Sequence, residues 1–222
     1  MFQILVGGVG TASQPDSDSG NGGGGGGSFF VSMSDIPLLI AGGGGGTRAA
    51  VSQDGTDASV TEYAYTGSSS SETYTPTLKV GDLGMGGIVS SSSWGSGGGG
   101  FYGDGASDGG FDRGGKSWAA GMLGGVGTAP GGFGGGGAGD GSWGGGGGGG
   151  YSGGDGGRVA GGGGSFNSGF DIFALAGIGY GHGSLSIEFL GDDIAPIPLP
   201  ASLPLLLAGV VGMRLVRKKS QA

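Results

Sequence analysis

The sequence contains no cysteine and only one histidine, His182. These absences exclude disulfide scaffolds, thiolate zinc sites, cysteine nucleophiles and multi-histidine metal centres. Proline is scarce, at 8 of 222 residues, and no Gly-X-Y repeat runs through the chain, so a collagen triple helix is excluded as well. Charged residues make up 12% of the chain, which is about half the usual share.

Glycine is what the chain has in excess, with 67 residues. It recurs in six uninterrupted tracts, at 22–27, 42–46, 97–100, 134–137, 144–150 and 161–164. Tracts of this kind are typical of flexible linkers and low-complexity disorder, and we keep that interpretation as one alternative.

The net charge is −8, and four of the nine basic residues lie within the last nine positions. The remainder of the chain is therefore more strongly acidic than the net charge suggests. An acidic body repels phosphate backbones, and the sequence has neither an RRM-type aromatic motif nor an Arg-Gly-Gly run. We expect no nucleic-acid partner.

The last 29 residues, 194–222, differ from the rest. Twenty uncharged residues run from Ile194 to Met213, which is enough for a helix to cross a bilayer. Prolines interrupt the first part, so a regular transmembrane helix is expected from about 201 to 216. The positive-inside rule places the basic residues in the cytoplasm and the acidic body outside. A buried helix of a soluble core and a tail anchor facing the cytoplasm are the alternatives. The basic residues that flank the helix are Arg214, Arg217, Lys218 and Lys219.

These features together resemble a C-terminal exosortase sorting signal of the VPLPA type, related to PEP-CTERM signals. The sorting motif is Ile197, Pro198, Leu199, Pro200 and Ala201. The resemblance implies an exosortase as processing partner, cleavage near Pro198–Ala201, a transient inner-membrane anchor, and delivery to the cell envelope, the surface or the exterior. It also implies that the catalytic cysteine belongs to the exosortase.

The N-terminus lacks the basic region and the long apolar run of an export signal. Since a sorting signal needs export, we expect the true start to lie upstream of Met1, so that the N-terminus is truncated.

Short strand-like segments adjoin the glycine tracts. They include 4–6, 28–31 and 37–41, and two more at 171–176 and 182–190, the last with Leu185, Ile187 and Phe189 in strict alternation. We expect His182 to lie in a turn before that last strand. Trp94, Trp118 and Trp143, with Phe101, Tyr102 and Phe133, are expected to form the small core rather than a sugar-stacking surface.

Glycine tracts also have an ordered option. A chain near polyproline-II geometry has three residues per turn and no internal hydrogen bonds, so neighbouring glycine chains can pack closely and bond to each other. We therefore predict a domain at 1–193 that is mainly β with packed polyglycine-II-type segments and long glycine loops. A sorting signal at 194–222, with one C-terminal transmembrane helix, follows it.

The order of these elements resembles the glycine-rich domain of the anaplastic lymphoma kinase and leukocyte tyrosine kinase ectodomains, which also occurs in bacterial surface proteins. The matching stretches are 4–7, 22–31, 37–46, 131–136, 144–154, 160–167 and 181–187. The resemblance implies strands combined with a polyglycine bundle. In the receptors that domain binds protein ligands.

Three motifs match nucleotide-binding, hydrolase or calcium-binding patterns but lack the neighbouring elements that those functions need. The P-loop pattern at 110–117 lacks a preceding apolar strand, the two G-x-S-x-G patterns around Ser107 and Ser152 lack a helix, and the aspartates of the glycine loops lack calcium-loop spacing. Those aspartates are Asp104, Asp108, Asp112, Asp140 and Asp155.

We therefore expect no enzyme, no cofactor and no metal site. The sequence favours an exported cell-surface or extracellular-matrix protein, structural or adhesive, in a biofilm setting with extracellular polysaccharide as a candidate partner. The alternative is an extracellular module that binds a protein or polysaccharide ligand.

Overall fold

The computed structural model describes residues 1–13, 20–48, 53–69, 74–90, 94–109, 113–139 and 143–189. Contacts divide the chain into two units, Met1–Leu185 and Ser186–Ala222. All the elements below belong to the first unit. The second is described only as far as residue 189, where it has no regular secondary structure.

A four-stranded antiparallel sheet joins β1 (Phe2–Leu5), β2 (Ser28–Ser32), β3 (Pro37–Ala41) and β4 (Phe166–Asn167), in that spatial order. The only helical element in the described residues is a single 3-10 turn, η1 (Trp118–Ala120). The prediction of a mainly β domain is confirmed in part, since the described residues are mainly non-helical and contain this antiparallel sheet. The strands expected at 4–6, 28–31 and 37–41 correspond to β1, β2 and β3.

Two expected strands are absent. Residues 171–176 and the described part of 182–190 pair with no strand, and nearly all of them are exposed. Asp171, Gly177 and Gly181 have φ values of 53°, 68° and 79°. These left-handed residues bend the backbone within the first segment and between the two segments. The alternation in 182–189 produces no strand because no other strand pairs with it.

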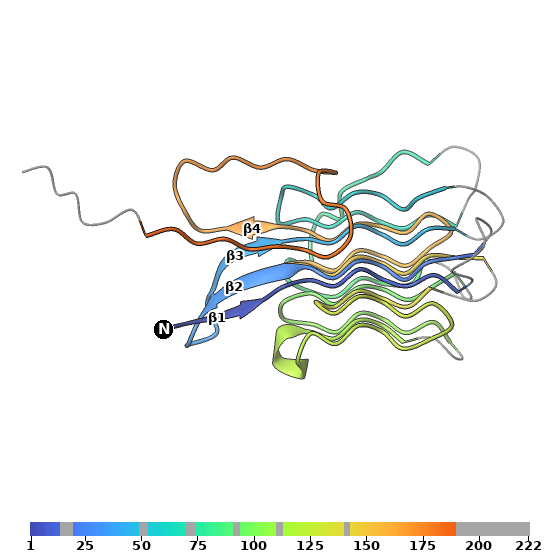
Figure 1. Cartoon of the computed structure of the whole chain (residues 1–222). Helices are drawn as coiled ribbons and strands as arrows, with labels where there is room; N and C mark the ends of the chain where they lie inside the picture. The colour runs from blue at the N-terminus through green and yellow to red at the C-terminus, as the bar shows by residue number, and fades with distance from the viewer. Residues whose placement is uncertain are drawn as a thin grey trace, which may run out of the picture. The chain divides into compact units, whose positions relative to one another are not determined.

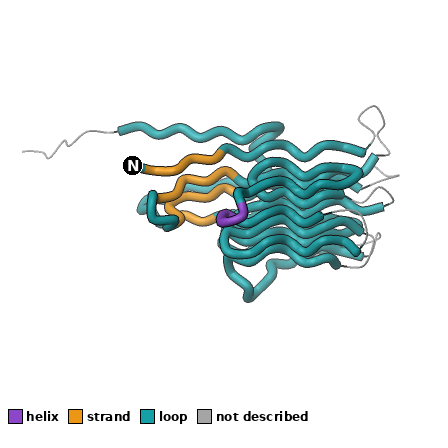
Figure 2. The backbone as a smooth tube through the Cα atoms, turned by 90° about the horizontal axis from the view of Figure 1, so that it is seen from below, coloured by secondary structure: helices purple, strands orange, loops and turns teal. Residues whose placement is uncertain are grey.

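The glycine tracts continue the strands as extended, wavy segments that run side by side (Figures 1 and 2). Gly22–Gly27 leads into β2, Gly42–Gly46 follows β3, and Gly161–Gly164 leads into β4. These segments contain no ladder of regular strands, yet most of their amides are hydrogen-bonded to other segments. We call this set of segments the glycine bundle.

Hydrogen bonds in the glycine bundle repeat every third residue. In Gly22–Gly27 the amides of residues 22 and 25 donate to Thr47 and Gly44, at 3.0 and 2.9 Å. Those of 23 and 26 donate to Thr11 and Gly8, and those of 24 and 27 to Gly137 and Gly134. The segment Gly22–Gly27 thus faces three different neighbouring stretches in rotation.

The segment Gly144–Gly150 is buried along its whole length. Its amides donate in the same three-residue rotation to residues in 157–161, 22–25 and 96–99, at 2.9–3.2 Å over Gly145–Gly150. Its carbonyls accept from residues in 43–46, from Gly137 and from residues in 154–157. Seven glycines are therefore enclosed by other backbone on every side.

Only glycine allows this closeness. A Cβ placed on Gly147 would lie closer than 3.0 Å to the carbonyl group of Gly154, a separation that real Cβ atoms essentially never show. Backbone hydrogen bonds, rather than side-chain packing, therefore hold this part of the molecule together.

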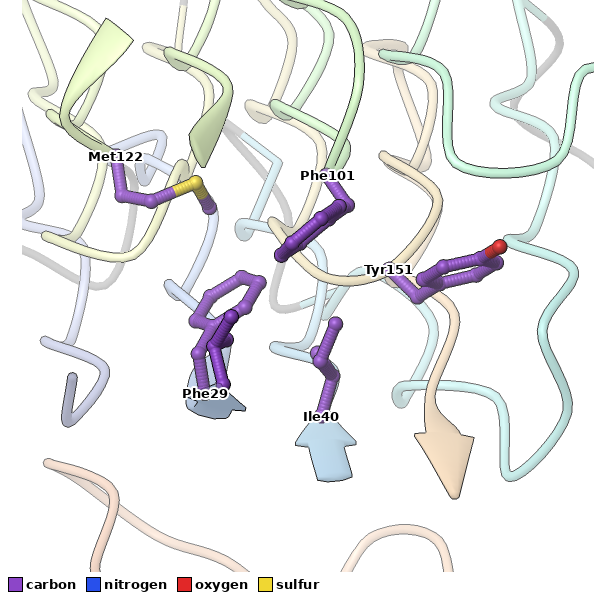
Figure 3. Close-up of a cluster of buried hydrophobic side chains, with 6 residues drawn as sticks. Phe29, Ile40, Phe101, Met122 and Tyr151 are labelled. Atoms are coloured by element: carbon purple, nitrogen blue, oxygen red, sulfur yellow. The ribbon is translucent and has the colours of Figure 1, made fainter. Parts of the chain in front are cut away.

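Where the glycines end, side chains fill the space. Leu5, Phe29, Ile40 and Phe166 are paired in register across the four strands and form one row on one face of the sheet. Phe29, Val31 and Ile40 are at most 1% exposed, and they pack against Phe101, Met122 and Tyr151 from other segments (Figure 3). The apolar core is small and lies at the sheet end of the bundle.

Candidate functional site

An open groove lies beside this core, at the sheet end of the glycine bundle, with a volume of about 550 Å³. Strand β1, the turn between β2 and β3, and the segments around η1 contribute its walls. We call it the aromatic groove. Its main lining residues are Gln3, Asp35, Phe101, Tyr102, Trp118 and Met122.

A carboxylate is held at one side of the groove. The Trp118 indole donates from Nε1 to Asp35 Oδ1 at 2.8 Å, and the Gln3 amide donates from Nε2 to the same oxygen at 2.9 Å. These two bonds lower the pKa of Asp35 below its ordinary value of 3.8, since both favour the charged form. Both bonds end on Oδ1, so Oδ2 is left as an acceptor for a ligand.

The position of Asp35 follows from its turn. Asp35 has a φ of 56°, a left-handed conformation that aspartate tolerates better than most residues. Its amide donates to Ser32 O at 3.1 Å, and the Ser32 hydroxyl accepts from the amides of Ser34 and Ile36. The hairpin between β2 and β3 therefore presents this carboxylate toward Trp118.

A row of aromatic rings begins in the groove, with Trp118 and Phe101, and continues into the core. The Trp118 and Phe101 ring centroids are 5.6 Å apart with planes at 16°, and Phe101 is stacked on Tyr151 at 6.5 Å. Tyr151 is stacked in turn on Phe166 at 4.8 Å. Tyr102 packs edge-on against Phe101 and is 60% exposed. An exposed ring beside an ionised carboxylate can bind a ligand that has both an apolar face and donor groups.

The aromatic residues singled out in the sequence are divided between core and surface. Phe101 is buried in the core and Trp118 packs against it, as expected. Tyr102, Phe133 and Trp143 are instead 46–60% exposed. For these three, placement in the core was wrong.

The described part of the P-loop pattern begins at Arg113. Lys116 Nζ pairs with Asp104 Oδ2 at 2.8 Å, and the Ser117 amide donates to Asp104 Oδ1 at 2.8 Å. Lysine and amide, which would contact phosphate in a P-loop, are thus bound to a carboxylate of the chain itself.

The two serines and the histidine serve the backbone. Ser152 is buried, donates from Oγ to Glu62 O at 2.6 Å and accepts from the Gly84 amide. Ser107 Oγ accepts from the Gly114 amide at 3.2 Å. The exposed His182 accepts at Nδ1 from the Val9 amide at 3.3 Å. Across the described ranges no hydrogen bond joins either serine to His182.

The loop aspartates have backbone partners as well. Asp155 accepts from the Ile88 amide at 2.8 Å and pairs with Lys79 at 3.4 Å, while Asp108 accepts from the Gly95 amide. Within the described residues no three acidic or histidine side chains are grouped so that they could hold a metal ion. Asp112 and Asp140 lie outside the described residues.

The sorting motif Ile197–Ala201 and the basic residues Arg214, Arg217, Lys218 and Lys219 also lie outside the described residues. Among the residues that are described, no helix is long and apolar enough to span a membrane.

Neither a family model nor a curated protein matches the sequence.

Sequence reasoning found Trp118 and Tyr102 but not Asp35 or Gln3. Asp35 is 83 residues from Trp118 and 32 from Gln3. Only the fold brings them together. The one local signal was the turn composition at 32–36, which predicts a hairpin but gives no partner.

Proposed function

We propose that the chain is an exported structural protein of the cell surface or extracellular matrix, built as a rigid scaffold of packed glycine segments. The observation that carries this proposal is the buried segment Gly144–Gly150, which is hydrogen-bonded to backbone in 22–25, 43–46, 96–99, 137 and 154–161. The apolar core is small, and most of the ordered backbone belongs to the glycine bundle. That is expected of a scaffold and is of no use to a flexible tether.

We propose further that the glycine segments are polyglycine-II helices, as in the glycine-rich domain that the sequence resembles. The support is the three-residue rotation of their hydrogen bonds, because a polyproline-II-type chain turns once every three residues and has no bonds of its own. Strands that extend from a glycine bundle are also part of that resemblance.

The C-terminal residues 194–222 are proposed as the sorting signal. In this proposal a transmembrane helix with Arg214, Arg217, Lys218 and Lys219 on its cytoplasmic side holds the precursor in the inner membrane. An exosortase then cuts near Pro198–Ala201 and releases the acidic body outward. The support is the order of motif, apolar span and basic cluster in the sequence.

A second candidate function is ligand binding in the aromatic groove. What favours it is that the exposed Tyr102 ring lines the same groove as the Asp35 carboxylate, whose Oδ2 is available. A saccharide offers such a groove both hydroxyl donors and an apolar ring face. The test is binding of an oligosaccharide array to the whole chain, to Tyr102→Ala, and to Phe133→Ala as a control aromatic of similar exposure. Loss in the first variant alone supports the groove, and equal binding by all three contradicts it.

Surface fractionation with intact-mass analysis of the mature protein tests the main proposal. We expect the protein in the envelope or the medium, with a mass that ends near residues 198–201 and lacks Arg214–Lys219. A mature protein that keeps Lys218 and Lys219 and fractionates with the cytosol would contradict it.

A further inference from the structure

A second group of side chains lies at the end of the glycine bundle away from the sheet, where the segment Gly144–Gly150 begins. Gly145 and Gly157 exchange amide-to-carbonyl hydrogen bonds at 2.9 and 3.2 Å, and Gly46 donates to Gly146 at 2.8 Å. This register brings together the residues that flank these glycines. We call them the distal cluster: Arg48, Ser90, Trp94, Trp143 and Arg158.

Arg158 is held between aromatic faces. Its guanidinium lies 4.7 Å from the centroid of the Trp94 ring and 5.8 Å from that of Trp143. Cation–π contacts of this kind fix the side chain in place while leaving its N–H donors unused. Trp143 is 46% exposed, so the cluster is open to the outside on that side.

The distal cluster contains buried donors without acceptors. In the described chain three buried side-chain atoms lack a hydrogen-bond partner, and all three belong to the cluster: Arg48 Nε, Arg158 Nε and Ser90 Oγ. Arg48 is only 8% exposed, and among the described residues its side chain donates from Nη1 to Gln53 Oε1 at 3.2 Å. A buried donor that is left unpaired costs free energy, and a charged one costs more.

The two arginines also lack an acidic partner in the described chain, where the ion pairs are Lys79–Asp155 and Lys116–Asp104. Burial, and then the charge of Arg158, lower the pKa of Arg48. Within the described part of the chain, two cations thus lie close to each other with no acidic partner. An anion between them would satisfy the unpaired donors and remove the repulsion at once.

We propose that the distal cluster binds the carboxylate of an acidic polysaccharide, with Arg48, Arg158 and Ser90 donating to the carboxylate oxygens and Trp143 packing against the sugar ring. The proposal rests on the extracellular role proposed above, where such polymers occur. The acidic body of the protein does not prevent binding, because salt screens charges beyond about 8 Å at physiological ionic strength.

The test uses the whole chain in a neutral detergent at constant ionic strength. Three probes are titrated while tryptophan fluorescence is followed: a trigalacturonate, an uncharged galactotriose, and sodium sulfate. We expect trigalacturonate to change the fluorescence and the neutral trisaccharide to leave it unaltered. Response to sulfate alone would show a site for free inorganic anions and overturn the saccharide assignment, as would no response to any probe.

Variants place the binding. Arg48→Gln is expected to weaken trigalacturonate binding by about tenfold or more, as the loss of a charge-assisted bond does. Arg113→Gln removes an exposed arginine outside the cluster and should bind like the original chain. Should Arg48→Gln fail to fold, Ser90→Ala removes an unpaired hydroxyl without breaking a bond, and severalfold weaker binding is expected of it. Unchanged binding in the folded cluster variants would overturn the proposal.

Failure here and failure of the scaffold proposal look different. A protein that is processed and found at the surface, but does not bind trigalacturonate, contradicts only the distal cluster. A cytosolic, uncut protein contradicts the scaffold proposal whether or not trigalacturonate binds.

Discussion

Gly24 and Gly25 are adjacent in the bundle but have opposite surroundings. A Cβ on Gly24 would lie closer than 3.0 Å to the carbonyl group of Gly147, whereas the nearest atoms to a Cβ on Gly25 are 3.5 Å away. Both amides are hydrogen-bonded, to Gly137 and Gly44 respectively, at 2.9 Å. The two positions therefore separate the effect of steric closeness from that of backbone hydrogen bonding.

We predict that Gly24→Ala lowers the free energy of unfolding by about 1–3 kcal/mol or more, because the neighbouring segment must move. Gly25→Ala is its matched control and is expected to change stability by less than about 1 kcal/mol, with a gain possible from reduced freedom of the unfolded chain. Denaturant unfolding of both variants measures the difference. Equal losses would show that the close packing at Gly24 is not real.

Asp35 supplies a second prediction at the scale of a residue. Because its pKa is lowered in the folded protein by Trp118 first and Gln3 second, it stabilises the fold above the pKa of the unfolded chain. That contribution is lost as the pH falls through the lower, folded value. An NMR titration should give a pKa below 3.8 for Asp35.

Trp118→Phe removes the indole donor and should raise that pKa toward 3.8. Gln3→Ala should raise it by a smaller amount, since the Gln3 bond is the weaker cause. An Asp35 pKa that neither variant moves would contradict the hydrogen-bonded geometry of the groove.

At the scale of an element, the direction of the amides in a glycine segment depends on whether residues are inserted in multiples of three. If a segment turns once in three residues, one extra glycine rotates every residue before it by about a third of a turn and directs its amides to the wrong neighbours. Three extra glycines restore the orientation and displace the chain by one turn into the preceding connection.

We predict that insertion of one glycine after Gly147 lowers the melting temperature more than insertion of three glycines at the same place. The comparison is unusual in that the longer insertion should be the milder one. A loss that simply grows with insertion length would contradict the three-residue rotation.

Elements also show what the sequence could and could not predict. Strands β1, β2 and β3 were predictable because their apolar residues adjoin glycines: Phe29 follows the tract 22–27, and Ile40 precedes the tract 42–46. Strand β4 has two residues, too few for any periodicity. The expected strand at 182–190 was wrong because Leu185, Ile187 and Phe189 alternate in a segment that no neighbouring strand accompanies. Alternation of apolar and polar residues gives a segment one apolar face, but a strand forms only when a neighbouring strand pairs with it.

On the scale of the whole molecule, a bundle could be anticipated from the number of glycine tracts. Which tracts are hydrogen-bonded to one another could not. Hydrogen bonds between glycines decide which segment lies next to Gly144–Gly150. Because glycines have no side chains, the sequence does not distinguish one such neighbour from another. The aromatic groove and the distal cluster depend on this arrangement of segments, because it brings Asp35 to Trp118 and Arg48 to Arg158. Their positions were therefore beyond the reach of sequence reasoning.

The two ends of the bundle carry different side-chain clusters, and this difference follows from the same arrangement of segments. Side chains gather where glycine tracts stop, so the core and the aromatic groove lie at the sheet end and the arginine–tryptophan cluster lies at the other. The middle of the bundle offers only backbone, already bonded. We therefore expect binding functions at the ends and mechanical stiffness between them.

The central claim is that the glycine tracts are ordered and mutually hydrogen-bonded, and amide hydrogen exchange on the whole chain tests it most directly. We predict strong protection of the amides of Gly145–Gly150, which are buried and bonded, and rapid exchange in the exposed stretch 169–181. Exchange of Gly145–Gly150 at the rate of an unstructured peptide would contradict the account.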